Sequence, residues 1–442
     1  MLETPPPATA EPRAPARPSA SVEEYGTEAA ILPSFHVWTL GCQMNQSDSE
    51  EMAGALLAAG CEEAPDLETA ELIVINTCSI REAAEHKVIG RMGVLSKLKQ
   101  ADPSVRVVLT GCSVRADNAD TLERRYPAVD LFLRPDEEPE LTARLGLGGP
   151  TTPEQLGAAG FERVGRSVAA TADRLAGTRA LAVEEGSIAR DRGAKAWIPI
   201  VYGCDKTCTY CIVPFARGPE RSRPFDDIVA EARTLADAGY REVTLLGQNV
   251  NSYGHDLPPD PRFAGLTSQR ELGRKQERQG RPDIAALLRA VDGIEGPDGT
   301  PAIPRLRFVT SHPWDLTERL IAAMAECASV CEHLHLPVQS GDDEVLRRMG
   351  RQYSVEAYLR LVERLRAAIP GISLTTDVIT GFSGETETQF EGTLELLRTV
   401  RFDQVFAAAY SERPGTPATR LEDDVPTVEK KRRLNALLAV QE

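Results

Sequence analysis

The stretch Gly203-Cys204-Asp205-Lys206-Thr207-Cys208-Thr209-Tyr210-Cys211 directly follows an apolar, strand-like segment at residues 197–202. It places three thiols on one loop in a C-x3-C-x2-C spacing. Three neighbouring thiolates can bind three irons of a [4Fe-4S] cluster and leave the fourth iron without a protein ligand. Electron-transfer clusters and structural zinc sites normally have four protein ligands, so this spacing predicts an open iron. A zinc loop or three inert thiols are the alternatives.

The sequence that contains this loop alternates between strand and helix patterns. Strand candidates lie at 197–202, 242–246, 305–310, 333–338, 373–380 and 403–410, and helical patterns lie at 225–238, 283–291, 315–325, 354–368 and 386–399. Six βα units are too few to close an eight-stranded barrel. We therefore expect an open, partial (β/α)6 barrel over residues 194–415, with its site at the carboxyl ends of the strands. Residues 416–442 are expected to be a helical segment.

A second α/β region precedes the barrel. Over residues 35–147, strand patterns at 35–40, 72–77, 105–110 and 131–133 alternate with helical patterns at 47–59, 81–99, 118–125 and 138–145. Such alternation predicts a flavodoxin-like parallel sheet with helices on both faces. Ser47 and Glu50 have the form of a capping box at the start of the first helix, and Gly60 suits its end. Residues 1–34, with six prolines among the first 18 positions, are expected to be a disordered tail, and residues 148–193 a linker.

A second set of three cysteines lies in this N-terminal region. Cys42, Cys78 and Cys112 each occur just past the end of a predicted parallel strand. In a doubly wound sheet these strand ends converge on one crevice, so the three thiols can meet there. A second iron–sulfur cluster with an open iron is the sharper hypothesis, and three small buried cysteines are the alternative.

The remaining cysteines carry a weaker signal. Cys327 and Cys331 are four residues apart on a helical pattern, and His333 and His335 follow on one face of a strand, so a metal site can be imagined. Core packing of a helix against a barrel strand explains the same residues. Cys61 follows a glycine that ends a helix and is expected to be buried.

Length, charge and cysteine count limit the class of protein. With 442 residues the chain is expected to form two or three domains. Six of its nine cysteines form triplets, which favours thiolate ligands in a reducing compartment over disulfides. The net charge of −16 argues against a surface that binds nucleic acid as a whole, so any RNA contact must be local. No apolar run approaches the length of a membrane span, and we expect a cytoplasmic protein without membrane contact.

With both triplets in place, the chain resembles the methylthiotransferases, which are radical S-adenosylmethionine (SAM) enzymes that insert sulfur and a methyl group at an unactivated C–H bond. The resemblance runs from residue 35 to residue 442. Residues 43–45 and 79–82 resemble the MiaB type, the branch that modifies isopentenylated adenosine beside the tRNA anticodon. Further matching motifs lie at 211–214, 217–224, 247–253, 336–341, 376–382 and 410–417.

The resemblance implies two [4Fe-4S] clusters and SAM as cofactors. It assigns radical formation to a cluster held by the catalytic cysteines Cys204, Cys208 and Cys211, and sulfur delivery to a cluster held by Cys42, Cys78 and Cys112. One SAM then serves as methyl donor and another as the radical source. Candidates for holding SAM or the target base are the polar residues at barrel strand ends, Gln248, Asn249, Gln339 and Ser340.

The implied partners are a tRNA anticodon stem-loop and an electron donor such as a flavodoxin or ferredoxin, and we expect a monomer. Arg217, Arg221, Arg223 and a basic insertion at 258–281 are candidates for RNA contacts. The RNA-binding C-terminal β-barrel usual in the family, the TRAM domain, is expected to be absent. Alternatives are the same chemistry on a ribosomal-protein aspartate or on threonylcarbamoyl-adenosine tRNA, and a non-catalytic iron–sulfur electron-transfer protein.

Overall fold

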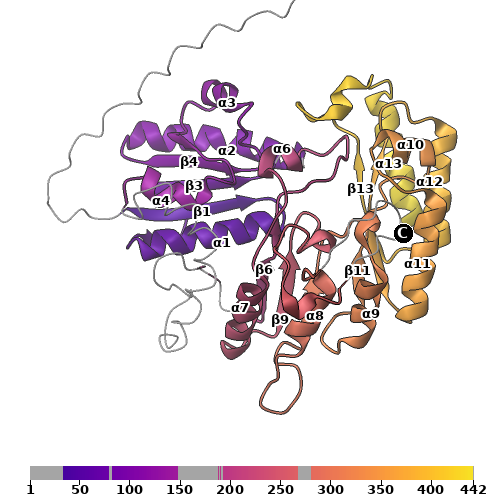
Figure 1. Ribbon diagram of the computed structural model, residues 1–442. Helices are drawn as coiled ribbons and strands as arrows, with labels where there is room; N and C mark the ends of the chain where they lie inside the picture. Colours follow the sequence, from indigo (N-terminus) through magenta and orange to yellow (C-terminus); the bar gives the residue numbers. More distant parts are fainter. Residues whose placement is uncertain are drawn as a thin grey trace, which may run out of the picture. The chain divides into compact units, whose positions relative to one another are not determined.

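A computed structural model describes residues 33–78, 82–147, 188, 190, 193–266 and 280–441 (Figure 1). Most of the predicted tail, most of the predicted linker and residues 267–279 of the basic insertion lie outside the described residues. Residues Pro33–Glu442 form one compact unit. Among the described helices, none is both long and apolar enough to cross a membrane.

The N-terminal sheet is parallel and has the strand order β2-β1-β3-β4-β5. Its strands are β1 (Ser34–Leu40), β2 (Glu62–Glu63), β3 (Leu72–Thr77), β4 (Arg106–Gly111) and β5 (Leu131–Phe132). This is the order of a flavodoxin-like doubly wound sheet, as predicted. The sequence did not indicate β2, because two exposed glutamates carry no apolar pattern.

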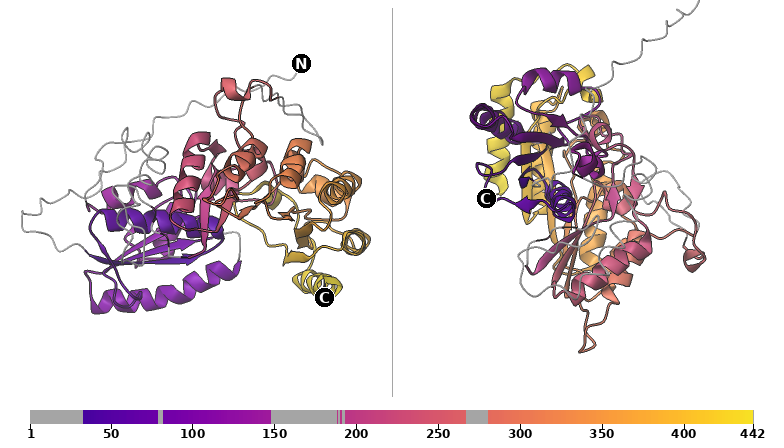
Figure 2. Two further views of the ribbon diagram at one scale, coloured as in Figure 1. Left: turned by 90° about the horizontal axis from the view of Figure 1, so that it is seen from below. Right: turned by 90° about the vertical axis from the view of Figure 1, so that its left-hand side faces the viewer.

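Helices cover both faces of this sheet (Figures 1 and 2). They are α1 (Gln43–Ala58), α2 (Glu82–Ala101), α3 (Ala119–Arg125), the 3-10 turn η1 (Glu138–Glu140) and α4 (Leu141–Arg144). On one face, Met52 and Leu56 of α1 pack with Leu72 and Val74 of β3. On the other face, side chains of α2, including Leu95, pack against the alternate residues of β3 and β4. The alternation of strand residues between two cores explains why β3 reads as a continuous apolar run.

The start of α1 differs from the prediction. The helix begins at Gln43 with Cys42 as its N-cap residue, so a capping box at Ser47 and Glu50 is wrong. The Asn45 side chain takes that role, because its Oδ1 accepts a hydrogen bond from the Cys42 N–H at 3.4 Å and its Nδ2 donates to Asn76 Oδ1 at 2.8 Å. The first turn of α1 is thereby fixed to the end of β3.

The barrel consists of two three-stranded parallel sheets, with orders β10-β9-β6 and β11-β12-β13. A parallel bridge between Leu306 and Val330 joins the two sheets, so the strands follow one another in chain order. This is the predicted partial (β/α)6 barrel. The strands are β6 (Lys195–Pro199), β9 (Glu242–Leu246), β10 (Arg305–Phe308), β11 (His333–His335), β12 (Ser373–Thr380) and β13 (Gln404–Ala409).

Two barrel strands are shorter than predicted because of prolines. β6 ends at Pro199, and Pro337 follows closely after β11; a proline has no N–H to donate to a neighbouring strand. Beyond Pro199, β7 (Val201–Tyr202) pairs antiparallel with β8 (Arg221–Ser222) instead of continuing the barrel strand.

Helices pack on the outer side of the barrel strands (Figures 1 and 2). They are α7 (Phe225–Asp237), α8 (Ile284–Asp292), α9 (Glu318–Glu326), α11 (Val355–Ala368), α12 (Glu387–Val400) and α13 (Thr427–Gln441). The short α6 (Val213–Arg217) and α10 (Asp343–Arg348) were not predicted. α6 follows the cysteine loop in the chain, and the Thr209 hydroxyl of that loop donates to the Arg348 carbonyl at the end of α10. Two described residues of the predicted linker, Ile188 and Arg190, are buried.

Candidate iron–sulfur and SAM site

The three N-terminal cysteines meet at one edge of the sheet. Leu40, Thr77 and Gly111, the last residues of β1, β3 and β4, are paired side by side in the strand register. Cys78 and Cys112 follow Thr77 and Gly111 directly, and Cys42 follows Leu40 after one glycine, so the predicted convergence is present. Cys78 and Cys112 are buried and Cys42 is exposed. Burial raises the pKa of the Cys112 thiol to about 12, and the charges of Cys78 and Cys42 contribute to the rise, because the three sulfurs are close enough to interact.

The loop cysteines follow β7 at the carboxyl end of the first barrel strand. The Cys204 N–H donates to Gly218 O at 3.1 Å, and the Cys211 N–H donates to Cys208 O at 3.1 Å. Burial raises the pKa of the Cys204 thiol. Burial and the charge of Cys208 raise that of Cys211 to about 12. The charge of Cys112 also acts on Cys211, so the two triplets lie within electrostatic reach of each other.

Each triplet has one buried arginine against a thiol. Arg217 Nε donates to Cys112 Sγ at 3.2 Å, and Arg351 Nη1 donates to Cys208 Sγ at 3.5 Å. His312 Nε2 lies 4.0 Å from the same Cys208 sulfur. Because a buried thiol must lose its proton before it can bind iron, a guanidinium beside it favours the required thiolate. Sequence reasoning missed these roles of Arg217, Arg351 and His312.

The two cysteine triplets do not have the close spacing of a site for a single zinc ion. Thiolates that share one zinc lie about 3.8 Å apart, given Zn–S bonds of about 2.3 Å in a tetrahedron. Among the residues that the structure describes, one set of three His, Cys, Asp or Glu side chains has all its ligand atoms within 4.8 Å, and this set is Asp205, Glu220 and His255. Both cysteine triplets are therefore more open than a mononuclear site requires.

Asn249 is linked to the cysteine loop through Asp315, and Gln248 precedes Asn249 in the chain. Asn249 Nδ2 donates to Asp315 Oδ2 at 2.6 Å, and Lys206 Nζ lies 2.5 Å from the same carboxylate oxygen. The Asn249 side chain also accepts a hydrogen bond from the His312 N–H. Among the described residues, the buried Gln248 Oε1 has no hydrogen-bond partner, which leaves it available to a ligand. Both residues remain candidates for SAM or base contacts.

Gln339 and Ser340 differ from each other in their surroundings. Gln339 has a positive φ of 73°, and its backbone pairs with Asp377 and Ile379 next to β12. The Ser340 hydroxyl is fully buried, lies 3.4 Å from Thr393 Oγ1 of α12 and accepts from the Asp342 N–H. Ser340 therefore holds α12 to the end of the strand. Among the described residues, the Gln339 side chain has no comparable contact with a helix. Both assignments to ligand binding stay predictions.

Two of the arginines predicted to contact RNA are inside the protein. Arg217 and Arg223 are 5% and 1% exposed. Arg223 pairs with Glu231 and donates to Pro199 O, so neither side chain can reach a phosphate. Arg221 is exposed and remains a candidate. In the described part of the basic insertion, Arg262 is paired with Asp226 and Asp260.

The metal site imagined around Cys327 and Cys331 is not formed. Cys327 packs in the barrel core, and His335 contacts Thr375 Oγ1 and Asp377 Oδ2. Within the described ranges, these residues do not form a set of ligand atoms close enough for one ion. The core-packing interpretation of Cys327 holds.

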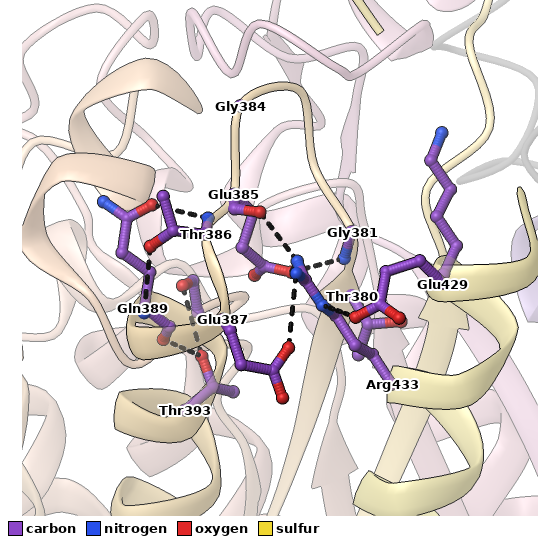
Figure 3. Close-up of polar contacts among 12 residues, drawn as sticks. Thr380, Gly381, Gly384, Glu385, Thr386, Glu387, Gln389, Thr393, Glu429 and Arg433 are labelled. Atoms are coloured by element: carbon purple, nitrogen blue, oxygen red, sulfur yellow. Dashed lines mark hydrogen bonds and ion pairs between the residues drawn. The ribbon is translucent and has the colours of Figure 1, made fainter. Parts of the chain in front are cut away.

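The loop after β12 is fixed by the last helix (Figure 3). Arg433 of α13 pairs with Glu385 at 3.0 Å, Glu387 at 3.4 Å and Glu429 at 2.8 Å. Glu385 in turn accepts from the Gly381 N–H at 2.6 Å. The helical segment predicted within residues 416–442 is therefore present as α13, and it supports the end of a barrel strand.

The fold and the three-thiol loop define a radical SAM enzyme. Residues 198–397 match the family model of the radical SAM superfamily, and residues 34–134 match that of the uncharacterized protein family UPF0004. The fold resembles that of the radical S-adenosylmethionine methyltransferase TsrM from Kitasatospora setae, with a TM-score of 0.57 and 16% identity over 87% of this chain and 76% of that one.

Relatives narrow the class to one family. The chain is 43% identical over 409 residues, 92% of its length, to the tRNA-2-methylthio-N(6)-dimethylallyladenosine synthase of Carboxydothermus hydrogenoformans, of which it covers 83%. It is 42% identical to the synthase of Moorella thermoacetica, over 92% of this chain and 82% of that one. The chain belongs to the tRNA-2-methylthio-N(6)-dimethylallyladenosine synthase family.

Proposed function

We propose that this protein installs a methylthio group on C2 of isopentenylated adenosine next to the tRNA anticodon. It is a radical SAM tRNA methylthiotransferase that uses [4Fe-4S] clusters and SAM. The observation that carries the proposal is the pair of cysteine triplets, each at the carboxyl ends of parallel strands and each with a buried arginine on one thiol. A non-catalytic electron carrier would not need two open sites, and the relatives' names do not favour a ribosomal-protein substrate.

The chemistry requires two different open sites. The C2–H bond of adenine is unactivated, so ordinary acids, bases and nucleophiles cannot break it. When bound, the two clusters and SAM supply the radical that breaks this bond and the methylated sulfur that replaces the hydrogen. We assign the first task to Cys204, Cys208 and Cys211.

The second task, sulfur delivery, is assigned to Cys42, Cys78 and Cys112. Gln248 and Asn249 are proposed to hold SAM or the base. Arg217, six residues after Cys211, donates a hydrogen bond to Cys112 Sγ at 3.2 Å, and this contact supports a transfer between neighbouring sites.

The proposed partners are a tRNA anticodon stem-loop and a one-electron donor such as a flavodoxin or ferredoxin. Because the chain carries a net charge of −16, RNA contacts must be local, and an anticodon loop offers bases that are already unpaired. We propose a monomeric, cytoplasmic enzyme, where thiol ligands remain reduced.

Mass spectrometry of tRNA nucleosides from cells with and without the gene tests the proposed substrate. We expect the methylthio form of isopentenyladenosine to disappear and the unmodified isopentenyladenosine to accumulate in its place. Unchanged methylthio-adenosine content would contradict the tRNA assignment and direct attention to ribosomal protein.

A further inference from the structure

Arg217 joins the two cysteine sites. It is the last residue of α6 and lies six positions after Cys211 in the sequence. Its side chain is 4% exposed. Nε donates to Cys112 Sγ at 3.2 Å, and Nη2 donates to Asp48 Oδ2 of α1 at 2.5 Å. One guanidinium from the barrel therefore contacts both a thiol and the first helix of the N-terminal sheet.

The backbone around Arg217 is held rigidly to the loop cysteines. The Cys204 N–H donates to the carbonyl of Gly218, and the Gly218 N–H donates to Pro214 O, both at 3.1 Å. A Cβ on Gly203 would lie 2.1 Å from Pro219 O, so the two ends of the loop are in direct contact. Because the loop closes next to Arg217, the arginine cannot move far without moving Cys204.

Arg217 places a cation against the Cys112 sulfur. An arginine guanidinium stays protonated in proteins, and this one is buried between Cys112 Sγ and the Asp48 carboxylate. Hydrogen bonds to a cluster sulfur and net charge nearby are two of the factors that set the reduction potential of an iron–sulfur cluster.

We propose that Arg217 is a positioning residue for the N-terminal cluster: it orients Cys112, offsets the charge of its thiolate and fixes this cluster relative to the radical-generating loop. The inference rests on the proposed function, because it requires iron at Cys42, Cys78 and Cys112. Removal of the cation and of its N–H···S bond should weaken iron retention and make the cluster harder to reduce. A residue that only supported the fold would change neither property.

The test uses the full chain with Cys204, Cys208 and Cys211 changed to Ala, so that only the N-terminal triplet can bind a cluster. In this parent protein, Arg217→Met is combined with Asp48→Asn, which avoids a buried, unpaired carboxylate. The matched control is Arg223→Met with Glu231→Gln, a buried ion pair whose hydrogen bonds, among the described residues, go to groups other than the six cysteines. Iron and sulfide per chain, the rate of iron loss to a chelator and the midpoint potential followed by electron paramagnetic resonance are measured after anaerobic reconstitution.

We expect the Arg217→Met, Asp48→Asn protein to lose iron about tenfold faster than its parent. Because this variant removes a positive and a negative charge together, the more negative midpoint potential that we expect comes from the lost N–H···S bond, while the control matches the parent. Arg217→Lys alone keeps the charge but not the two-pronged contact, so its potential should shift in the same direction by less. This variant also decides the question if the double variant does not fold. A parent that binds no iron would overturn the proposed function itself. A parent that binds iron, with unchanged potential and iron loss in both Arg217 variants, would overturn the inference.

Discussion

Glu51 makes the stability of this protein depend on pH in a direction opposite to that of a typical surface carboxylate. It lies on α1, and Tyr202 Oη of β7 donates to its Oε1 at 3.2 Å. Burial raises the Glu51 pKa from 4.5 to about 7, the charge of Asp48 contributes to the rise, and the Arg223 guanidinium opposes it. The folded chain therefore retains a proton that the unfolded chain releases at lower pH.

The sign and size of the effect follow from this difference. Well below pH 4.5, Glu51 is protonated in both the folded and the unfolded state, and it does not lower the free energy of unfolding. As pH rises from 4.5 through about 7, the unfolded state ionises first, and the folded state loses stability. One pKa step corresponds to about 1.4 kcal/mol, so the full loss is about 3 kcal/mol, of which about 2.5 kcal/mol falls between pH 5 and pH 8.

The perturbation is Glu51→Gln, which keeps an oxygen for the Tyr202 hydroxyl and removes the titration. Urea unfolding of the apoprotein at pH 5, 6, 7 and 8 gives the free energy of unfolding of wild type and variant. We expect the variant to gain about 2.5 kcal/mol on wild type between pH 5 and pH 8. Glu123→Gln, on the exposed side of α3, is the control and should follow wild type. Parallel curves for wild type and Glu51→Gln would refute the argument.

Two further predictions concern the loop site. Arg351→Met removes the N–H donor to Cys208 Sγ. It should slow SAM cleavage, measured as 5′-deoxyadenosine formation, by about tenfold, and it should lower the reduction potential of the loop cluster, measured by redox titration. An unchanged potential would count against a role of this contact. Gly203→Ala adds a Cβ 2.1 Å from Pro219 O at a φ of 75° and should reduce iron bound at the loop triplet, whereas Gly239→Ala, with a φ of 88° and no atom within 4 Å of its Cβ, should cost only about 1 kcal/mol of stability. If the two glycine variants bind equal amounts of iron, the collision of the new Cβ with Pro219 O does not reduce iron binding.

The fold and both cysteine triplets could be predicted because local patterns determine them. β3 and β12 have the predicted bounds, since apolar and β-branched residues mark both strands. Cys42, Cys78 and Cys112 follow three such strands, and parallel pairing alone brings strand ends together. The predicted start of α1 was wrong. Asn45 is fixed by a hydrogen bond to Asn76 of β3, and a pattern of residues that are neighbours in the sequence does not reveal this contact.

The charged residues of the site could not be predicted for the same reason. Arg217 reaches a cysteine 105 positions away, and Arg351 reaches one 143 positions away. In the sequence, Arg217 and Arg223 look like part of a basic surface, and only the three-dimensional packing places them against Asp48 and Glu231. The contact between the Ser340 hydroxyl and Thr393 of α12 also spans a long stretch of sequence, and the role of Ser340 in ligand binding stays a prediction.

The division of labour between the triplets is the central claim, and one assay tests it. Reconstituted Cys204→Ala and Cys78→Ala proteins are incubated with SAM, dithionite and an isopentenylated anticodon stem-loop, and 5′-deoxyadenosine and methylthio product are quantified together. We predict no 5′-deoxyadenosine from Cys204→Ala, and measurable 5′-deoxyadenosine without methylthio product from Cys78→Ala. Equal loss of 5′-deoxyadenosine in both variants would contradict the account.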